Sequence, residues 1–236
     1  MRLTKVGIRS PDADRSLCEG KRKLGKLDVA KGERRARIIE AAEQLVRQTE
    51  SSDFSMKELA ATAGLSTATT YNLIGSKSTV LYILLNRCVD QLRESNESLT
   101  DTGSAVDRIE RSTSMAVEFF SRDPGFYRPL MQFLLGVPDP VHRPAFMNRA
   151  SELWLQAVRP LADQYKFPLV VTADDFAKTL NIIFTGALDL WVHAELNDTQ
   201  FQAQMTQSLW LLLITLPGID AQRAEAALAD SRRALS

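Results

Sequence analysis

Residues 55–77 read SMKELAATAGLSTATTYNLIGSK and hold the signals that decide the fold. Ser55 and Glu58 have the spacing of a capping box, in which each side chain accepts a hydrogen bond from a free backbone N–H of the first helical turn. The residues that follow predict a short helix over residues 56–62.

A sharp turn and a second helix start come directly after this helix. Gly64 suits the turn, because glycine adopts a left-handed backbone conformation without a steric penalty. Ser66 can cap a second helix over residues 67–73. The residues expected to let the two helices pack closely are Leu59, Ala60, Leu65 and Leu73. Two capped helices this close together are typical of a helix-turn-helix, and a tight hairpin in an ordinary helical bundle is the alternative.

The second of these helices is polar. It carries Thr67, Thr69, Thr70, Tyr71 and Asn72, whose short hydrogen-bonding groups suit contact with base edges and phosphates. A helix buried in a bundle would be more apolar. The polar face therefore favours DNA binding over a simple helical hairpin.

In this region the chain resembles the TetR family of transcriptional regulators, whose N-terminal signature is similar to residues 34–81. The resemblance is carried by a first helix, a second helix with its turn, an aromatic position and the start of a fourth helix. The matching segments are residues 37–46 (RIIEAAEQLV), 57–60 (KELA) and 63–66 (AGLS), then Thr70-Tyr71, Ser76-Lys77 and Val80-Leu81. It implies an all-α protein with an N-terminal DNA-binding head and a C-terminal helical bundle for effector binding and dimerisation.

The chain departs from the family pattern at three places. Residues 49–52 (TESS) stand where a glycine usually follows the first helix. Residues 72–74 (NLI) replace the usual histidine or tyrosine and phenylalanine, and Thr67-Ala68 replaces the usual glycine after the serine cap. The resemblance therefore implies the fold but does not transfer the residue-level DNA code.

Position in the motif selects the candidate DNA contacts. The candidates for base edges are Thr67, Ala68, Thr69 and Asn72. The candidates for phosphates are Ser55, Lys57, Tyr71 and Lys77, the last because a helix N-terminus also favours an anion. A solvated surface lysine is the alternative for Lys77, and a half-buried packing residue is the alternative for Tyr71.

Charge is divided unevenly along the chain. The 236 residues have a formal net charge of zero. Residues 1–93, however, contain 17 Lys and Arg against 11 Asp and Glu, so this part carries a net charge of +6 and the remainder carries −6. A basic part that contains the helix-turn-helix is expected when one end of a protein meets phosphates.

The most basic segment is residues 1–32. It holds few large apolar residues, lacks sustained periodicity and contains Pro11, Gly20, Gly25 and Gly32. These features predict an extended or disordered basic arm, followed by a helix-turn-helix domain over residues 33–77. Such an arm would reach the DNA backbone or a minor groove beside the main site, and an inert solubilising tail is the alternative.

Features that would indicate other classes of protein are missing from the sequence. No run of about 18 apolar residues and no signal-peptide pattern occurs, which predicts a cytoplasmic protein without a transmembrane helix. Cys18 and Cys88 are the only cysteines, which argues against a disulfide framework. His142 and His193 lack acidic neighbours at a metal-binding spacing, and no phosphate loop, nucleophile elbow or nucleotide fingerprint occurs. We therefore expect no catalytic residue, no metal and no cofactor.

From Lys77 onward the pattern is helical. An apolar stripe predicts a linking helix over residues 78–96, formed by Val80, Leu81, Leu84, Leu85, Cys88, Val89 and Leu92. Further helices are predicted over residues 104–121, 125–135, 143–164, 173–195, 199–215 and 219–233, with proline and glycine at most of the breaks. Residues 78–236 are interpreted as one effector-binding and dimerisation domain.

The resemblance implies an effector cavity among these helices. Aromatic and sulfur-bearing residues are frequent there, and most of them are expected to be ordinary core. The pocket candidates are Met115, Phe119, Phe126, Tyr127, Met131, Trp154 and Phe184. A largely apolar cavity suits a lipophilic or aromatic effector, with Tyr127, Arg128, Gln132 and Asn181 as candidate polar groups.

The helices predicted over residues 173–195 and 199–215 resemble the dimerisation elements of the family. Their apolar surface is larger than one monomeric face can hide. The interface candidates are Gly186, Trp191, Met205, Leu209 and Leu212. A symmetric dimer would place two recognition helices about 34 Å apart, on successive major grooves of a palindromic operator.

The sequence thus predicts a TetR-type repressor that binds double-stranded operator DNA as a homodimer. The resemblance implies that a small lipophilic or aromatic effector releases the DNA by favouring a dimer in which the helix over residues 78–96 has swung the heads out of register. The alternatives are a ligand-independent regulator or an activator of the same fold, or an all-helical interaction protein that does not bind DNA.

Overall fold

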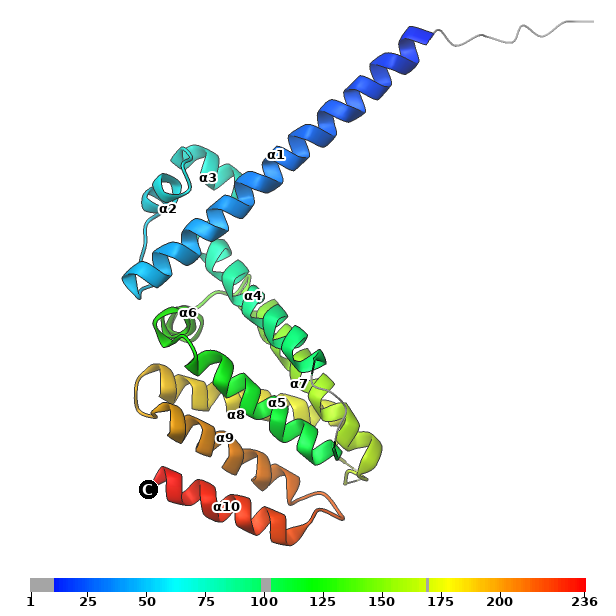
Figure 1. Cartoon of the computed structure of the whole chain (residues 1–236), viewed down its shortest axis with the longest axis vertical. Helices are drawn as coiled ribbons and strands as arrows, with labels where there is room; N and C mark the ends of the chain where they lie inside the picture. The colour runs from blue at the N-terminus through cyan, green and yellow to red at the C-terminus, as the bar shows by residue number, and fades with distance from the viewer. Residues whose placement is uncertain (1–10, 99–102, 169) are drawn as a thin grey trace, which may run out of the picture.

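The described part of the chain is entirely helical. The computed structural model describes the backbone of residues 11–98, 103–168 and 170–236, and within these ranges it describes side chains from residue 28 onward. Ten helices and no strand occur in these ranges (Figure 1), which confirms the predicted all-α class. The helices are α1 (Pro11–Thr49), α2 (Met56–Thr62), α3 (Thr67–Ile74), α4 (Lys77–Glu97), α5 (Ala105–Ser121), α6 (Pro124–Gly136), α7 (Arg143–Gln164), α8 (Ala173–Val192), α9 (Asp198–Leu213) and α10 (Ala221–Leu235).

The head consists of the C-terminal half of α1 together with α2 and α3. Its core is formed by buried apolar residues from all three helices, among them Ile38, Val46, Leu59 and Ile74. Ala60 is buried where α2 meets its neighbours, and Leu65 and Leu73 pack against the core from partly exposed positions. The three helices thus form a small packed unit at the top of the molecule in Figure 1.

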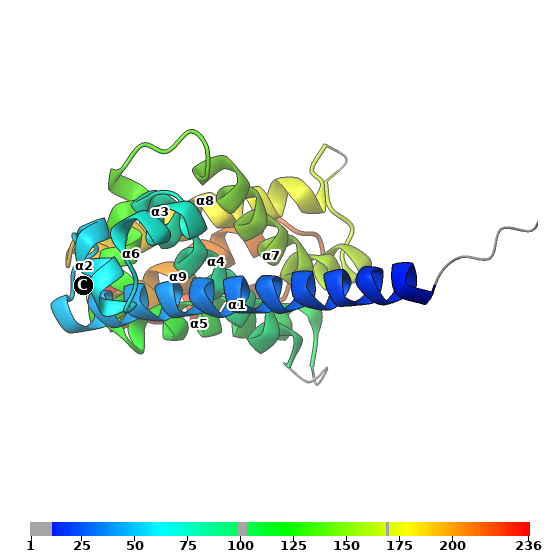
Figure 2. The ribbon, with the colours of Figure 1, turned by 90° about the horizontal axis from the view of Figure 1, so that it is seen from above.

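Helix α1 corrects the prediction of an extended or disordered arm over residues 1–32. The helix begins at Pro11 and runs without a break to Thr49, so residues 11–32 are helical and no boundary falls at residue 33. Residues 1–10 lie outside the described residues. Lys, Arg, Leu, Ala and Glu are good helix formers. Extending an existing helix also avoids the free-energy cost of nucleation. Together these two effects outweigh the destabilising effect of the glycines on the helix. Figures 1 and 2 show α1 projecting far beyond the head.

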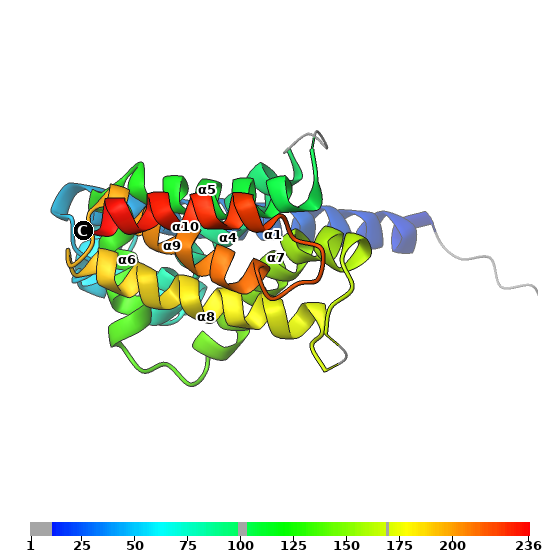
Figure 3. The same cartoon turned by 90° about the horizontal axis from the view of Figure 1, so that it is seen from below.

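Helix α4 connects the head to the body. It starts at Lys77, where the Ser76 side chain accepts a hydrogen bond from the backbone N–H of Thr79, and it buries the predicted apolar stripe. In the body α7 packs on α4 and α8, while α9 packs on α5, α8 and α10. Figure 3 shows α8, α9 and α10 running side by side along the face opposite the head.

A polar contact ties α10 to the start of α5. Asp107 belongs to the capping box of α5 with Ser104, and its carboxylate also accepts a hydrogen bond from Arg223 on α10 at 2.6 Å. Arg223 donates to Glu110 as well, and Glu110 accepts from the indole N–H of Trp210 at 2.8 Å. The hydrogen bonds from Ser104, together with Arg223, hold the pKa of Asp107 at about 2. Ionisation of Asp107 therefore stabilises the fold.

We expect Asp107→Asn to lower the free energy of unfolding at pH 7 by about 1 kcal/mol, the typical contribution of a helix cap. Because the folded-state pKa lies below the ordinary value of 3.8, the charged carboxylate stabilises the fold above about pH 4 and this stabilisation is lost as the pH falls to about 2. Denaturant titrations should show the difference between the variant and the parent shrinking over this range. Glu225→Gln, at an exposed position on α10, is the control. If Asp107→Asn and the parent differed equally in free energy of unfolding at pH 7 and at about pH 2, the assignment would be refuted.

Candidate DNA-binding surface and buried cavity

The helix-turn-helix is held by local caps, as its sequence predicts. Ser55 Oγ accepts from the backbone N–H of Glu58 at 3.1 Å, and Glu58 Oε2 accepts from the N–H of Ser55 at 2.7 Å. Gly64 takes the left-handed conformation with a φ of 63°. Ser66 Oγ accepts from the N–H of Thr69 at 3.1 Å and so starts α3.

Arg37 on α1 fixes the turn between α2 and α3. Its Nη2 donates to the carbonyl oxygens of Ala63 at 2.5 Å and Gly64 at 3.1 Å. An added Cβ at Gly64 would lie 3.2 Å from the same nitrogen, so the glycine also leaves room for the guanidinium. The sequence placed Arg37 only at the start of the segment that resembles the family's first helix, because this contact joins residues that are far apart in the chain.

We expect Arg37→Gln to lower the free energy of unfolding of the head by about 1.5–3 kcal/mol, the range for hydrogen bonds made by charged groups. Amide hydrogen exchange in α2 and α3 should become faster, because the turn carbonyls lose their fixed donor. The neighbouring Arg35→Gln is the matched control, since Arg35 is exposed on the same helix. Equal exchange rates in both variants would show that Arg37 does not hold the turn.

The exposed face of α3 is presented by Ala68, Tyr71 and Asn72. Thr67 and Thr69 are half-buried, and the Thr69 hydroxyl lies 2.8 Å from Ser66 Oγ. Thr70 is buried and donates to the carbonyl of Ser66. Of the four base-edge candidates, Ala68 and Asn72 are therefore the most accessible, and a role in base contact stays a prediction for all four.

The phosphate candidates surround this face but are not equally free. Lys57 is exposed, and Tyr71 is 51% exposed. The Ser55 side chain is engaged in the capping box. Lys77 Nζ lies 3.2 Å from a carboxylate oxygen of Asp53 and 5.2 Å from the centre of the Phe54 ring. A phosphate would have to compete with Asp53 for Lys77, so Lys57 and Tyr71 are the more available pair.

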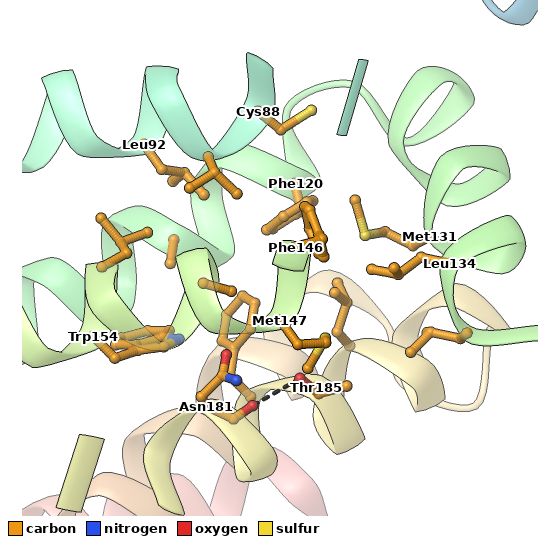
Figure 4. Close-up of a pocket in the computed structure, with 17 residues that line it drawn as sticks. Cys88, Leu92, Phe120, Met131, Leu134, Phe146, Met147, Trp154, Asn181 and Thr185 are labelled. Atoms are coloured by element: carbon orange, nitrogen blue, oxygen red, sulfur yellow. Dashed lines mark hydrogen bonds between the residues drawn. The ribbon is translucent and has the colours of Figure 1, made fainter. Parts of the chain in front are cut away.

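A buried apolar cavity lies in the body beneath α4. Its free volume is about 60 Å³, and its walls come from α4, α5, α6, α7 and α8 (Figure 4). The large side chains around it include Phe120, Met131, Phe146, Met147, Trp154 and Phe184. This volume is well below the roughly 300–1,000 Å³ of typical ligand sites, so a ligand would have to displace wall side chains. The flexible thioether side chains of the two methionines suit such rearrangement.

Three of the seven predicted pocket residues line this cavity, namely Met131, Trp154 and Phe184. The other four lie outside it and correct that part of the prediction. Phe119, Phe126 and Tyr127 form an aromatic cluster, with Tyr127 4.8 Å from Phe119 and 5.2 Å from Phe126 between ring centres, and Met115 is half-buried on α5. Adjacent residues on a helix point about 100° apart, so the cavity receives Phe120 rather than Phe119.

The polar groups of the cavity gather on α8. Asn181 donates from Nδ2 to Ser151 Oγ at 3.1 Å, and the Thr185 hydroxyl donates to the carbonyl of Asn181 at 2.7 Å. Of the four candidate polar groups only Asn181 lines the cavity. On the opposite wall, burial raises the pKa of the Cys88 thiol to about 12, so Cys88 is not a reactive thiolate.

The structure also corrects the predicted dimer interface. Trp191, Met205 and Leu209 are fully buried inside the protomer, where the Trp191 indole donates to Asp198 at 2.7 Å. Leu212 is partly buried against the same core, and Gly186 is exposed. The apolar side chains that α8 and α9 leave exposed are Ile182, Leu190, Leu211 and, directly after α9, Ile214. These four residues and Gly186 are called the α8–α9 surface below.

Neither a metal-binding cluster nor a membrane-spanning helix occurs among the described residues. No group of three or more His, Cys, Asp or Glu side chains is placed to hold a metal ion. None of the described helices combines the length and the apolar character needed to cross a membrane.

This architecture is similar to that of several solved structures. No protein-family model and no curated protein matches the sequence. Among solved structures, Thermus thermophilus FadR, a TetR-family repressor in complex with lauroyl-CoA, matches with a TM-score of 0.67 and 23% identity, covering 79% of this chain and 97% of that chain. NalD of Pseudomonas aeruginosa, a repressor of the MexAB-OprM multidrug efflux pump, matches at 0.57 and 18%, covering 80% and 100%. CprB of Streptomyces coelicolor, in complex with its operator, matches at 0.53 and 19%, covering 86% and 96%.

These matches extend over both the head and the body of the chain. They agree with the capped helix-turn-helix, the linking helix α4 and the helical body described above. The chain has the fold of the TetR family of transcriptional regulators.

Proposed function

We propose that this protein is a TetR-family transcriptional repressor that binds a palindromic operator as a homodimer and is released by a small lipophilic or aromatic effector. The observation that carries the proposal is the exposed face of α3, where Ala68, Tyr71 and Asn72 project from a helix whose preceding turn is fixed by caps and by Arg37. Short side chains let a helix approach base edges, and an asparagine amide can pair with adenine through two hydrogen bonds. A cytoplasmic location belongs to the same proposal.

The α8–α9 surface supports the homodimer. Ile182 is 69% exposed and Leu211 is 53% exposed, although both lie in helices that bury other apolar side chains in the core. Apolar side chains at such positions are better accommodated in a symmetric interface than in water. Gly186 leaves open space above α8, which would allow a partner helix to approach closely.

The apolar cavity supports an effector with a large apolar part. Its walls are almost entirely apolar, and Asn181 offers one amide at the α8 end. The likeness to a structure that holds lauroyl-CoA is in keeping with a long apolar group. We infer that such a ligand enters by displacing Met131 and Met147, and that this expansion moves α4 and α6, which both contribute to the wall.

Titration of fluorescent DNA tests the central part of the proposal. The full-length protein should bind the DNA upstream of its own gene more tightly than DNA of random sequence in the same salt. Asn72→Ala should remove roughly 1–3 kcal/mol of this preference, the value of a good bidentate base contact. Gln222→Ala removes an exposed amide on α10, far from the head, and serves as the control. Equal affinity for both DNAs would reject the proposal.

An effector is sought separately by thermal denaturation with alkyl and aromatic compounds. A compound that binds the folded cavity raises the melting temperature. If it is an effector, it must also weaken operator binding. A compound that stabilises the protein without affecting DNA binding would favour the ligand-independent alternative for the regulator.

A further inference from the structure

The residue that follows α1 adopts an unusual backbone conformation. Glu50 has a φ of 46°, in the left-handed region that is unfavourable for residues other than glycine. It lies in residues 49–52, where the chain departs from the glycine usual in the resembling family. A non-glycine residue persists in such a conformation when surrounding contacts hold it there, so the position of its side chain is informative.

The Glu50 side chain lies against the start of α6. A Cβ built at Gly125 would be 3.1 Å from Oε1 of Glu50 and 3.3 Å from its Cδ. Gly125 therefore leaves the space that the carboxylate occupies. Glu50 belongs to the head and Gly125 belongs to the body, so this contact bridges the two.

A second contact joins the same two parts one helical turn earlier in α1. The guanidinium of Arg47 forms an ion pair with Asp123, and it stacks over the Phe126 ring at 4.1 Å from the ring centre. Asp123 stands at the N-cap of α6, yet its carboxylate makes no capping hydrogen bond. The side chain that would normally cap α6 is directed to the head instead.

We propose that Arg47 and Glu50, acting on Asp123, Gly125 and Phe126, form a clamp that fixes the orientation of the head relative to α6. We call these five residues the α1–α6 clamp. Helix α6 also supplies Met131, Leu134 and Leu135 to the cavity wall. If the proposed effector function holds, the clamp is a route from the cavity to the head that is separate from α4.

The side chains of Arg47 and Asp123 are 43% and 40% exposed. Exposed ion pairs in general contribute little to stability. The clamp is therefore a positioning device, and its loss should change the orientation of the head more than the stability of the fold. This distinction makes the clamp testable without knowledge of the operator or the effector.

The experiment measures the distance between head and body by pulsed electron spin resonance. Spin labels are attached to Ala61→Cys on α2 and Ala229→Cys on α10, both exposed positions, in full-length protein that also carries Cys18→Ser. Labelled protein is diluted with unlabelled protein, so that only distances within one protomer are recorded. The variants are Arg47→Gln, Asp123→Asn and Glu50→Gly, and melting temperatures are recorded in parallel.

We expect each clamp variant to broaden the distance distribution while the melting temperature stays near that of the parent. Glu50→Gly is the most informative variant, because it relieves the backbone conformation and should keep or raise the melting temperature while it loosens the head. Lys178→Gln is the matched control, since Lys178 pairs with Asp174 within α8 at 2.6 Å. Distributions as narrow as the parent's in all three variants, or broadening that accompanies general unfolding, would overturn the clamp. A failure to bind DNA would bear on the proposed function alone.

Discussion

Ile182→Lys is expected to convert the protein to a monomer and to remove specific operator binding. Ile182 is 69% exposed in the protomer, so a lysine there leaves the protomer fold nearly unchanged. In a symmetric interface the same lysine meets its own copy or apolar partner residues. Burial of an unpaired charge costs roughly 3 kcal/mol or more, which weakens dimerisation by about a hundredfold or more.

The mass in solution and the affinity for DNA check this expectation together. Sedimentation should give a mass near the 26.3 kDa of one chain for the variant and about twice that for the parent. Val141→Lys is the matched control, because Val141 is 76% exposed and lies between α6 and α7. A dimeric Ile182→Lys protein would move the interface away from the α8–α9 surface.

Trp154→Ala is expected to lower the free energy of unfolding strongly. Trp154 is buried in the cavity wall and its ring lies 5.2 Å from that of Phe184. Removal of a buried tryptophan side chain costs about 3–5 kcal/mol, because apolar contacts are lost and the space is only partly refilled. Chemical denaturation should show this loss as a lower midpoint without a change in slope.

The enlarged cavity provides a second test of the same variant. Indole resembles the deleted side chain and should raise the melting temperature of Trp154→Ala more than that of the parent. The parent is the reference, because its Trp154 side chain still occupies this space. Equal effects of indole on Trp154→Ala and on the parent would show that the space around Trp154 does not accept ligands.

The helix-turn-helix could be predicted closely from the sequence because its signals are local. Ser55, Glu58, Gly64 and Ser66 act on backbone groups within a few residues, and the predicted helices over 56–62 and 67–73 agree with α2 and α3. The basic segment before residue 33 was predicted wrongly where it is described. Its composition was interpreted as disorder, whereas continuation of α1 makes the same residues helical from Pro11.

The cavity and the dimer surface were only partly predictable, because periodicity does not show which neighbour a residue meets. Trp191 and Met205 have the spacing of an interface stripe but point into the protomer. Ile182 lies on the other side of α8, outside that stripe. Arg37 was likewise missed as a positioning residue, because its partners at the turn are 26 and 27 residues away in the sequence.

Selection of binding sites from random double-stranded DNA tests the central claim most directly. Full-length protein should enrich a palindrome whose half-sites are centred about one helical turn, or a multiple of it, apart. Asn72→Ala, which alters the exposed face of α3, should lose preference at one position in each half-site. Two results would contradict DNA reading by α3. One is that no sequence is enriched. The other is that Asn72→Ala enriches the same sequence as the parent while Gln222→Ala enriches a different one.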